Sequence, residues 1–244
     1  MIKENLIKNL LQLLFIEVLF EVGFINIVKI FNISSNLYTI FIEKTLFLIL
    51  LVTLNRKLTK IHIQFSIQLD RHEINNLVML IVMLFGIGIM HIDRILYAFV
   101  IGLVACLTEE YLMRGIVLTS LISIFQNFKN KYARILLPVM ISSIFFGSEH
   151  LINLYSQNLS MTIVQVVMTT AMGFVLSGIF LRTTNLLYPM VCHFSLDYLI
   201  IIINGISENS NVSIYDVIFP TIFYLFVGFV IMLPIFDQNQ NTIR

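Results

Sequence analysis

Apolar segments of membrane-spanning length dominate this sequence. A helix needs about 20 mostly apolar residues to cross the hydrocarbon core of a bilayer, and polar connections separate several windows of that kind. They run at 9–30, 37–54, 75–92, 95–125, 136–156, 161–181, 186–204 and 215–235. Only 12% of the residues are charged, against about 25% in an ordinary globular domain. The sequence therefore predicts an all-α polytopic membrane bundle of eight helices, forming one transmembrane domain over residues 1–244.

The positive charges predict the orientation of this bundle, because cytoplasmic loops of membrane proteins carry an excess of Lys and Arg. With eight spans, most of the positive charges fall on the side that holds both termini. These charges are Lys3, Lys8, Arg56, Lys57, Lys60, Arg71, Lys129, Lys131, Arg134, Arg182 and Arg244. The opposite side keeps only Lys29 and Arg94. We therefore expect both termini to be cytoplasmic.

Three charged residues interrupt the fourth span, in the stretch LTEEYLMRG at 107–115. An ionisable group within a membrane helix costs about 2.5–3.5 kcal/mol on insertion scales, so it usually faces the protein interior and serves a function. Glu110 and Arg114 are four residues apart and can form an ion pair along one helix face. Glu109 points about 100° away from Glu110. Its carboxylate is therefore predicted to be free for chemistry.

Two further spans carry histidine. His150 follows Phe146 by four residues in the fifth span, and His193 precedes Asp197 by four residues in the seventh. Each pair thus shares a helix face. Taken singly, such groups are often structural hydrogen-bond partners between helices. Together, Glu, His and Asp side chains on three helices are the types that activate water, and the combination favours a catalytic site.

The remaining polar residues carry weaker signals. Glu17 and Glu21 lack basic partners in their own helix, and we interpret them as structural. Cys106 and Cys192 form no disulfide or metal pattern and are predicted to be small buried hydrophobes. The net charge of +1, without a basic cluster interleaved with aromatic residues, gives no reason to expect a nucleic-acid partner.

At these residues the sequence resembles the CPBP family of intramembrane proteases, which contains the type II CAAX prenyl endopeptidases and bacterial proteins linked to bacteriocin processing and self-immunity. The motifs of that family are EExxxR, FxxxH and HxxxN. Here they read EEYLMR at 109–114, FGSEH at 146–150 and HFSLD at 193–197. The resemblance covers about residues 100 to 200, within a motif-bearing core at 95–204.

The resemblance implies a role for each motif residue. Glu109 and His150 would activate a water molecule for attack on a peptide carbonyl, while His193 and the residue at 197 would stabilise the tetrahedral oxyanion. The other motif residues would give structural support: Glu110, Arg114 and Phe146.

Asp197 departs from the family pattern, which usually has Asn at this position. An ionised carboxylate would repel an oxyanion, so Asp197 either keeps a proton in the apolar interior or has another task. One such task is metal ligation. A plausible set of ligands for Zn²⁺ consists of Glu109, His150, His193 and Asp197. The sequence leaves glutamate-dependent and metal-dependent hydrolysis open.

The expected function is an endopeptidase that cuts a membrane-associated peptide or protein, in bacteriocin or peptide maturation, self-immunity or CAAX-type processing. One alternative is a non-catalytic scaffold or immunity protein that binds a peptide or a partner protein in the same cavity. A proton or ion carrier is a third reading, which the lack of an inverted repeat disfavours. Frequent Ile, Asn, Phe and Lys indicate AT-rich coding. We therefore expect a location in a bacterial plasma membrane.

Overall fold

A computed structural model describes residues 2–34, 36–205 and 214–237, and the described part of the chain contains helices and no strands. The α-helices are α1 (Ile2–Ile30), α2 (Leu37–Leu54), α3 (Arg71–Ile89), α4 (Ile95–Glu110), α5 (Thr119–Phe125), α6 (Lys131–Glu149), α7 (Leu159–Thr183), α8 (Leu187–Asn204) and α9 (Ile214–Asp237). Two π-helical segments, η1 (Asn55–Thr59) and η2 (Tyr111–Leu118), and the 3₁₀ segment η3 (His150–Tyr155) extend them.

The predicted polytopic helical bundle is confirmed. Seven helical stretches in the described residues are long and apolar enough to cross a membrane, and each corresponds to one of the predicted windows after the first. The first window corresponds to α1, which is also long enough to span a bilayer but contains several charged side chains. The predicted fourth window, 95–125, is one continuous helical rod made of α4, η2 and α5. The chain is therefore an integral membrane protein.

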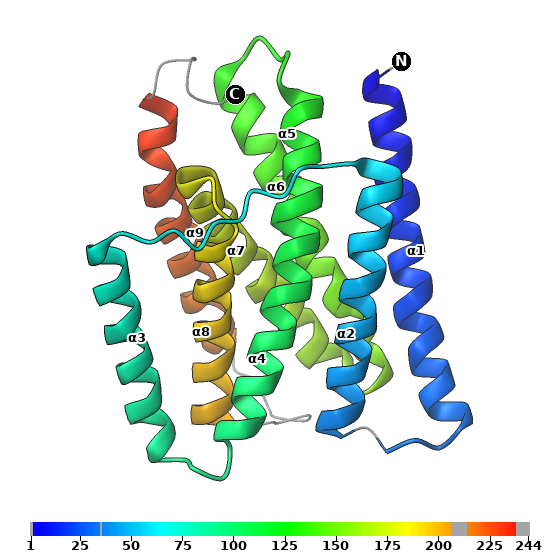
Figure 1. Ribbon diagram of the computed structural model, residues 1–244, viewed down its shortest axis with the longest axis vertical. Helices are drawn as coiled ribbons and strands as arrows, with labels where there is room; N and C mark the ends of the chain where they lie inside the picture. The colour runs from blue at the N-terminus through cyan, green and yellow to red at the C-terminus, as the bar shows by residue number, and fades with distance from the viewer. Residues whose placement is uncertain (1, 35, 206–213, 238–244) are drawn as a thin grey trace.

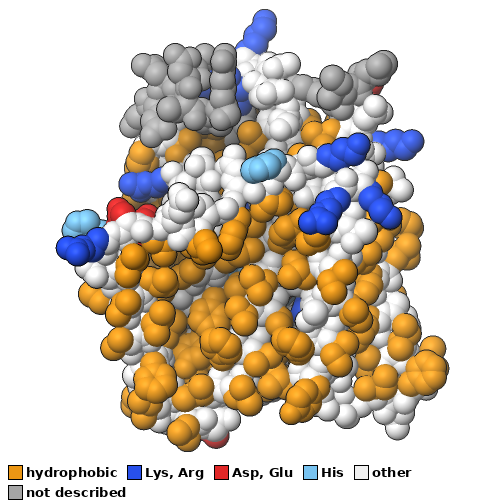
Figure 2. Space-filling model, in the orientation of Figure 1, with side chains coloured by type: hydrophobic (Ala, Val, Ile, Leu, Met, Phe, Trp, Pro, Cys, Tyr) orange, Lys and Arg blue, Asp and Glu red, His pale blue; other side chains and the backbone are white. Residues whose placement is uncertain are grey.

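The helices alternate in direction, so that α1 begins at the same end of the bundle at which α9 finishes (Figure 1). Lys and Arg side chains gather near this end, while apolar side chains cover the rest of the visible face (Figure 2). Exposed Arg56, Lys57 and Lys129 belong to the connections there. Such broad exposed apolar surface suits lipid contact. The side chain of Lys3 and all of Arg244, which entered the charge prediction, lie outside the described residues.

The packing places the motif-bearing helices in the middle of the bundle. The helix α4 packs on α2 and α8, and α7 packs on α6 and α9, whereas α3 makes its main contact with α8 at the edge (Figure 1). A capping box between Asp70 and Glu73 starts α3, and the Tyr188 hydroxyl of α8 donates to the Glu73 carboxylate. The residues 109–114, 146–150 and 193–197 thus lie on helices surrounded by other helices.

Close approach of α6 and α7 depends on Gly147, three residues before His150. A Cβ atom at this position would overlap the Thr170 hydroxyl and lie 2.7 Å from the backbone oxygen of Val166. We expect Gly147→Ala to force the two helices apart and lower the free energy of unfolding by about 1–3 kcal/mol. Thermal unfolding of the purified protein in detergent measures this change.

Gly86 supplies the matched control, because a Cβ atom there meets nothing within 4 Å. Gly86→Ala should leave stability unchanged or raise it by up to about 1 kcal/mol, since alanine favours a helix over glycine. Equal stability of the Gly147→Ala and unmodified proteins would contradict the tight packing of α6 on α7.

Candidate active site

Glu110 and Arg114 form the buried ion pair that their spacing predicts. The Arg114 Nη1 atom donates to Glu110 Oε1 at 2.8 Å, and both side chains have 0% exposure. The second guanidinium nitrogen, Nη2, donates to the backbone oxygen of Gly173 on α7 at 3.2 Å. The guanidinium also lies 4.4 Å from the ring centroid of Phe146 on α6, within reach of a cation–π contact. Arg114 therefore connects η2 with α6 and α7, and its side chain is buried away from lipid.

A π-helical segment follows Glu110 directly and contains Arg114. Its wider turn closes hydrogen bonds from residue i to i+5, and such segments occur often at functional sites. The Tyr111 hydroxyl at its start accepts a hydrogen bond from Asn55 Nδ2 of η1 at 3.2 Å. Ile63, from the connection between α2 and α3, packs against Gly115. Residues between α2 and α3 thus pack against the π-helical segment that contains Arg114.

His193 joins α8 to this pair. Its Nδ1 atom lies 2.8 Å from Glu110 Oε1, and the side chain is 2% exposed. Because Glu110 is an ion-paired carboxylate, Nδ1 must donate to it. The Nε2 atom of His193 then faces Asp197 Oδ2 at 3.3 Å and Glu109 Oε2 at 3.8 Å.

This arrangement requires a proton on the far side of the ring. If His193 were neutral and Asp197 ionised, two acceptors would face each other across 3.3 Å. Either His193 carries a second proton on Nε2, or Asp197 keeps its proton and donates it. In both cases a hydrogen-bond donor lies between His193 and Asp197, beside Glu109.

His150 also contacts Phe146. The Phe146 ring meets the rings of His150 and His193 edge-on, with centroid distances of 5.5 and 5.6 Å. The Nδ1 atom of His150 lies 3.1 Å from the Phe146 carbonyl oxygen, which can only accept, so Nδ1 carries a proton. In a neutral ring the Nε2 atom is therefore left as a base. The half-buried His150 residue also begins η3, where α6 ends.

The structure thus places Glu109 and Asp197 near the same ring nitrogen of His193, and the ring of Phe146 contacts both His193 and His150. A family model described as type II CAAX prenyl endopeptidase Rce1-like matches residues 91–199, which contain all three motifs. Over this segment, which is less than half of the chain, the sequence is similar to the CAAX protease family. No curated protein and no solved structure gave a match in the corresponding comparisons.

This match supports a CAAX-type intramembrane endopeptidase in general. It leaves the roles of single residues open. The zinc alternative lacks geometric support, because the described residues contain no group of three or more His, Cys, Asp and Glu that could hold a metal ion. The predicted ligands Glu109, His150, His193 and Asp197 therefore do not fit a metal as they are arranged, and we derive no step through one.

Sequence reasoning missed polar contacts between residues on different helices. Glu21, interpreted as structural, pairs with Lys44 of α2 at 3.0 Å. Asn55 also accepts from the backbone N–H of Ile61, which shapes the chain next to Tyr111. The predicted character of the two cysteines is confirmed, since both are free and at least partly buried within apolar surroundings.

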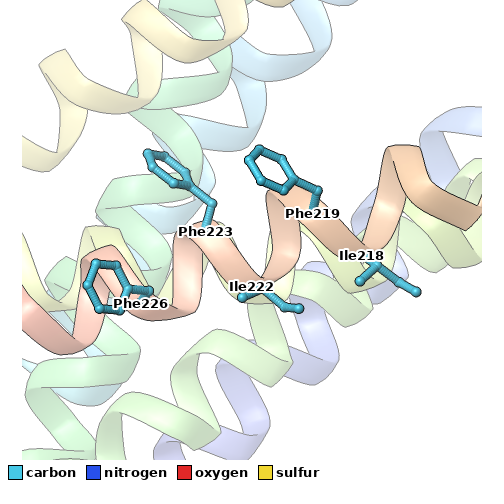
Figure 3. A pocket seen from close by; sticks show the side chains of 5 residues that line it. All are labelled: Ile218, Phe219, Ile222, Phe223 and Phe226. Atoms are coloured by element: carbon cyan, nitrogen blue, oxygen red, sulfur yellow. The ribbon is translucent and has the colours of Figure 1, made fainter.

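An apolar hollow lies on α9, a helix that carries none of the three motifs. Figure 3 shows that the five side chains lining it project from that one helix, and none is polar. They are Ile218, Phe219, Ile222, Phe223 and Phe226. A hollow of this kind suits lipid chains and offers no group for chemistry.

Proposed function

We propose that this protein is an endopeptidase that hydrolyses a peptide bond of a membrane-associated peptide or protein with a water molecule activated by Glu109 and His150. The observation that carries the proposal is the position of His193. Glu110 holds one of its ring nitrogens, while the other is turned toward Glu109 and Asp197. A carboxylate able to accept a proton and a donor able to stabilise an oxyanion thus lie side by side.

The reaction begins with removal of a proton from water. Glu109, whose side chain is 15% exposed, takes this proton as the water oxygen attacks the peptide carbonyl carbon. His150 Nε2 accepts a hydrogen bond from the same water and orients it. The electron pair of the C=O bond moves to oxygen, and the proton between His193 and Asp197 stabilises the resulting oxyanion. Glu109 then passes its proton to the leaving nitrogen as the C–N bond breaks.

The substrate is proposed to be a short membrane-associated peptide, such as a bacteriocin leader or a pheromone precursor, in a bacterial plasma membrane. Prenylated CAAX proteins are the alternative substrates that the family name suggests. A comparison of secreted and membrane peptides from cells with and without the protein tests the proposal. A peptide that is shortened only when the protein is present would support maturation, and identical peptide sets would count against it.

Asp197→Asn separates the two tasks considered for Asp197. The amide supplies a neutral N–H donor in place of the shared proton, and it removes a negative charge that a metal would need. We expect cleavage by the purified variant to stay within about tenfold of the unmodified protein, because the amide can stand in for the missing donor.

Elemental analysis of the same two preparations provides a readout that does not depend on activity. If Asp197→Asn loses both bound zinc and cleavage, the oxyanion assignment is wrong and Asp197 is a metal ligand. The exposed Asp93, between α3 and α4, provides the matched control, since Asp93→Asn should change neither quantity.

A further inference from the structure

A second cluster of acidic side chains lines a cavity of about 370 Å³ between α1 and the junction of α6 with η3. Glu17 and Glu21 face it from α1, and Glu149 faces it from α6. Most of the remaining lining is apolar, including Leu14 and Ile152. This volume is in the range of small-molecule sites, and its polar groups are few and convergent, as in a binding pocket.

Two of these carboxylates have no partner in the described part of the chain. Glu21 is paired with Lys44, but the same lysine makes no ion pair with Glu17. Glu17 is only 5% exposed and takes part in no hydrogen bond or ion pair among the described residues. The Oε1 atom of Glu149 is buried and unpartnered as well.

Unpaired carboxylates are costly in such a place. A buried polar group without a hydrogen bond, and still more a buried charge without a partner, destabilises the fold. Natural proteins keep such groups mainly where they bind something. Lys44 forms an ion pair with only one of the three carboxylates, Glu21. A cation entering the cavity would supply the partner that Glu17 and Glu149 lack.

Lys29, a second cation of this chain near the cavity, does not fill that role either. The Nζ atom of Lys29 lies 4.5 Å from the ring centroid of Tyr155, a residue that also lines the cavity. It forms no ion pair with a carboxylate within the part of the chain that the structure describes. A cationic group is thus accommodated near the cavity, while Glu17 and Glu149 stay unpaired.

The geometry of the cavity favours an organic cation over a metal ion. The described residues include no group of three or more His, Cys, Asp and Glu that could hold a metal. Instead, two carboxylates and an apolar wall suit the charged head and alkyl stem of a lysine or arginine side chain.

The cavity also adjoins the candidate active site in sequence and in space. Glu149 directly precedes His150, and Met113, which lines the cavity, directly precedes Arg114. We propose that this cavity binds a lysine or arginine side chain of the peptide substrate and so sets which bond is cut. This proposal rests on the proposed endopeptidase function and assigns that site a preference for cationic peptides.

Binding can be tested apart from cleavage with two small probes, octanoyl-arginine amide and octanoyl-citrulline amide, which differ in charge but hardly in shape. The arginine compound should raise the thermal unfolding temperature of the purified protein in detergent, and the citrulline compound should not, because a ligand stabilises the fold it binds. Glu17→Gln and Glu149→Gln should each remove the shift. Asp93→Asn, at an exposed carboxylate outside the cavity, should retain it.

Cleavage then tests the link to the substrate. In a series of hydrophobic peptides with one arginine or one citrulline at successive positions, arginine at one position should raise the cleavage rate by roughly 10- to 100-fold. Glu17→Gln should lose this preference for arginine, whereas Asp93→Asn should keep it.

The outcomes separate the two proposals. The protein could cleave peptides without any preference for arginine and show no shift in unfolding temperature. This result would rule out cation binding in the cavity and leave the proposed endopeptidase function unaffected. A shift that depends on Glu17, with no cleavage of any peptide, supports the cationic site and overturns the endopeptidase. A shift that Asp93→Asn also loses shows non-specific binding and overturns the cavity.

Discussion

Glu109→Gln should lower the rate of peptide cleavage by about 10²–10⁴-fold while leaving the fold intact. The range is that of a lost general base, because the amide cannot take a proton from water. Stability should hold, since the side chain keeps its shape, is partly exposed and lies 3.8 Å from His193, beyond hydrogen-bond distance. His150→Ala should have a comparable effect on cleavage. The measurement is turnover of a membrane peptide by purified protein in lipid, alongside thermal unfolding.

Asp93→Asn is the control, because it removes an exposed carboxylate between α3 and α4 by an equally conservative change. Full turnover by Glu109→Gln would rule out the proposed mechanism.

The non-catalytic alternative makes a different prediction in cells. If Glu109→Gln protects cells or supports signalling as well as the unmodified protein does, the chain acts as a scaffold or immunity protein that binds its partner without cutting it.

Arg114→Met should lower the free energy of unfolding by about 3–5 kcal/mol, a large part of the stability of most proteins. The change removes the guanidinium that neutralises Glu110 at a site with no exposure, and it leaves the carboxylate with His193 alone. The bond to the Gly173 carbonyl on α7 is lost as well. Thermal unfolding in detergent and the yield of folded protein measure the effect.

The double variant Glu110→Gln with Arg114→Met tests whether this loss comes from an uncompensated charge. Replacing both partners with neutral groups of similar shape should recover most of the stability that the single change removes. Cleavage should stay low, because the neutral amide holds His193 less firmly than the carboxylate does. A double variant as unstable as Arg114→Met would show that packing of the guanidinium, and not its charge, stabilises the site.

The sequence alone determined the order and approximate bounds of the seven helical stretches long and apolar enough to cross a membrane, although it predicted eight spans. The reason is local: a bilayer of fixed thickness demands apolar runs of fixed length, and these are visible in one dimension. The pairing of Glu110 with Arg114, and of His193 with Asp197, was equally predictable, because residues four apart share a helix face whatever surrounds it. The role proposed for each of these residues stays a prediction.

Only the tertiary structure decided which groups on different helices meet. Nothing near Glu21 in sequence indicates Lys44 as its partner, and nothing near His193 indicates that Glu110 holds its Nδ1 atom. The contact of the Phe146 ring with His193 also depends on how α6 and α8 pack.

The π-helical segment at Tyr111–Leu118 shows the same limit within a single helix. Its apolar pattern resembles that of any membrane span, so the sequence predicted an unbroken α-helix over 95–125. The i to i+5 hydrogen bonds of a π-helix are favoured over the ordinary ladder only by surrounding contacts, here those of Asn55 and Gly173 with Tyr111 and Arg114. Helix length is a property of the chain, whereas the contacts that shape its active centre arise only when distant helices pack together.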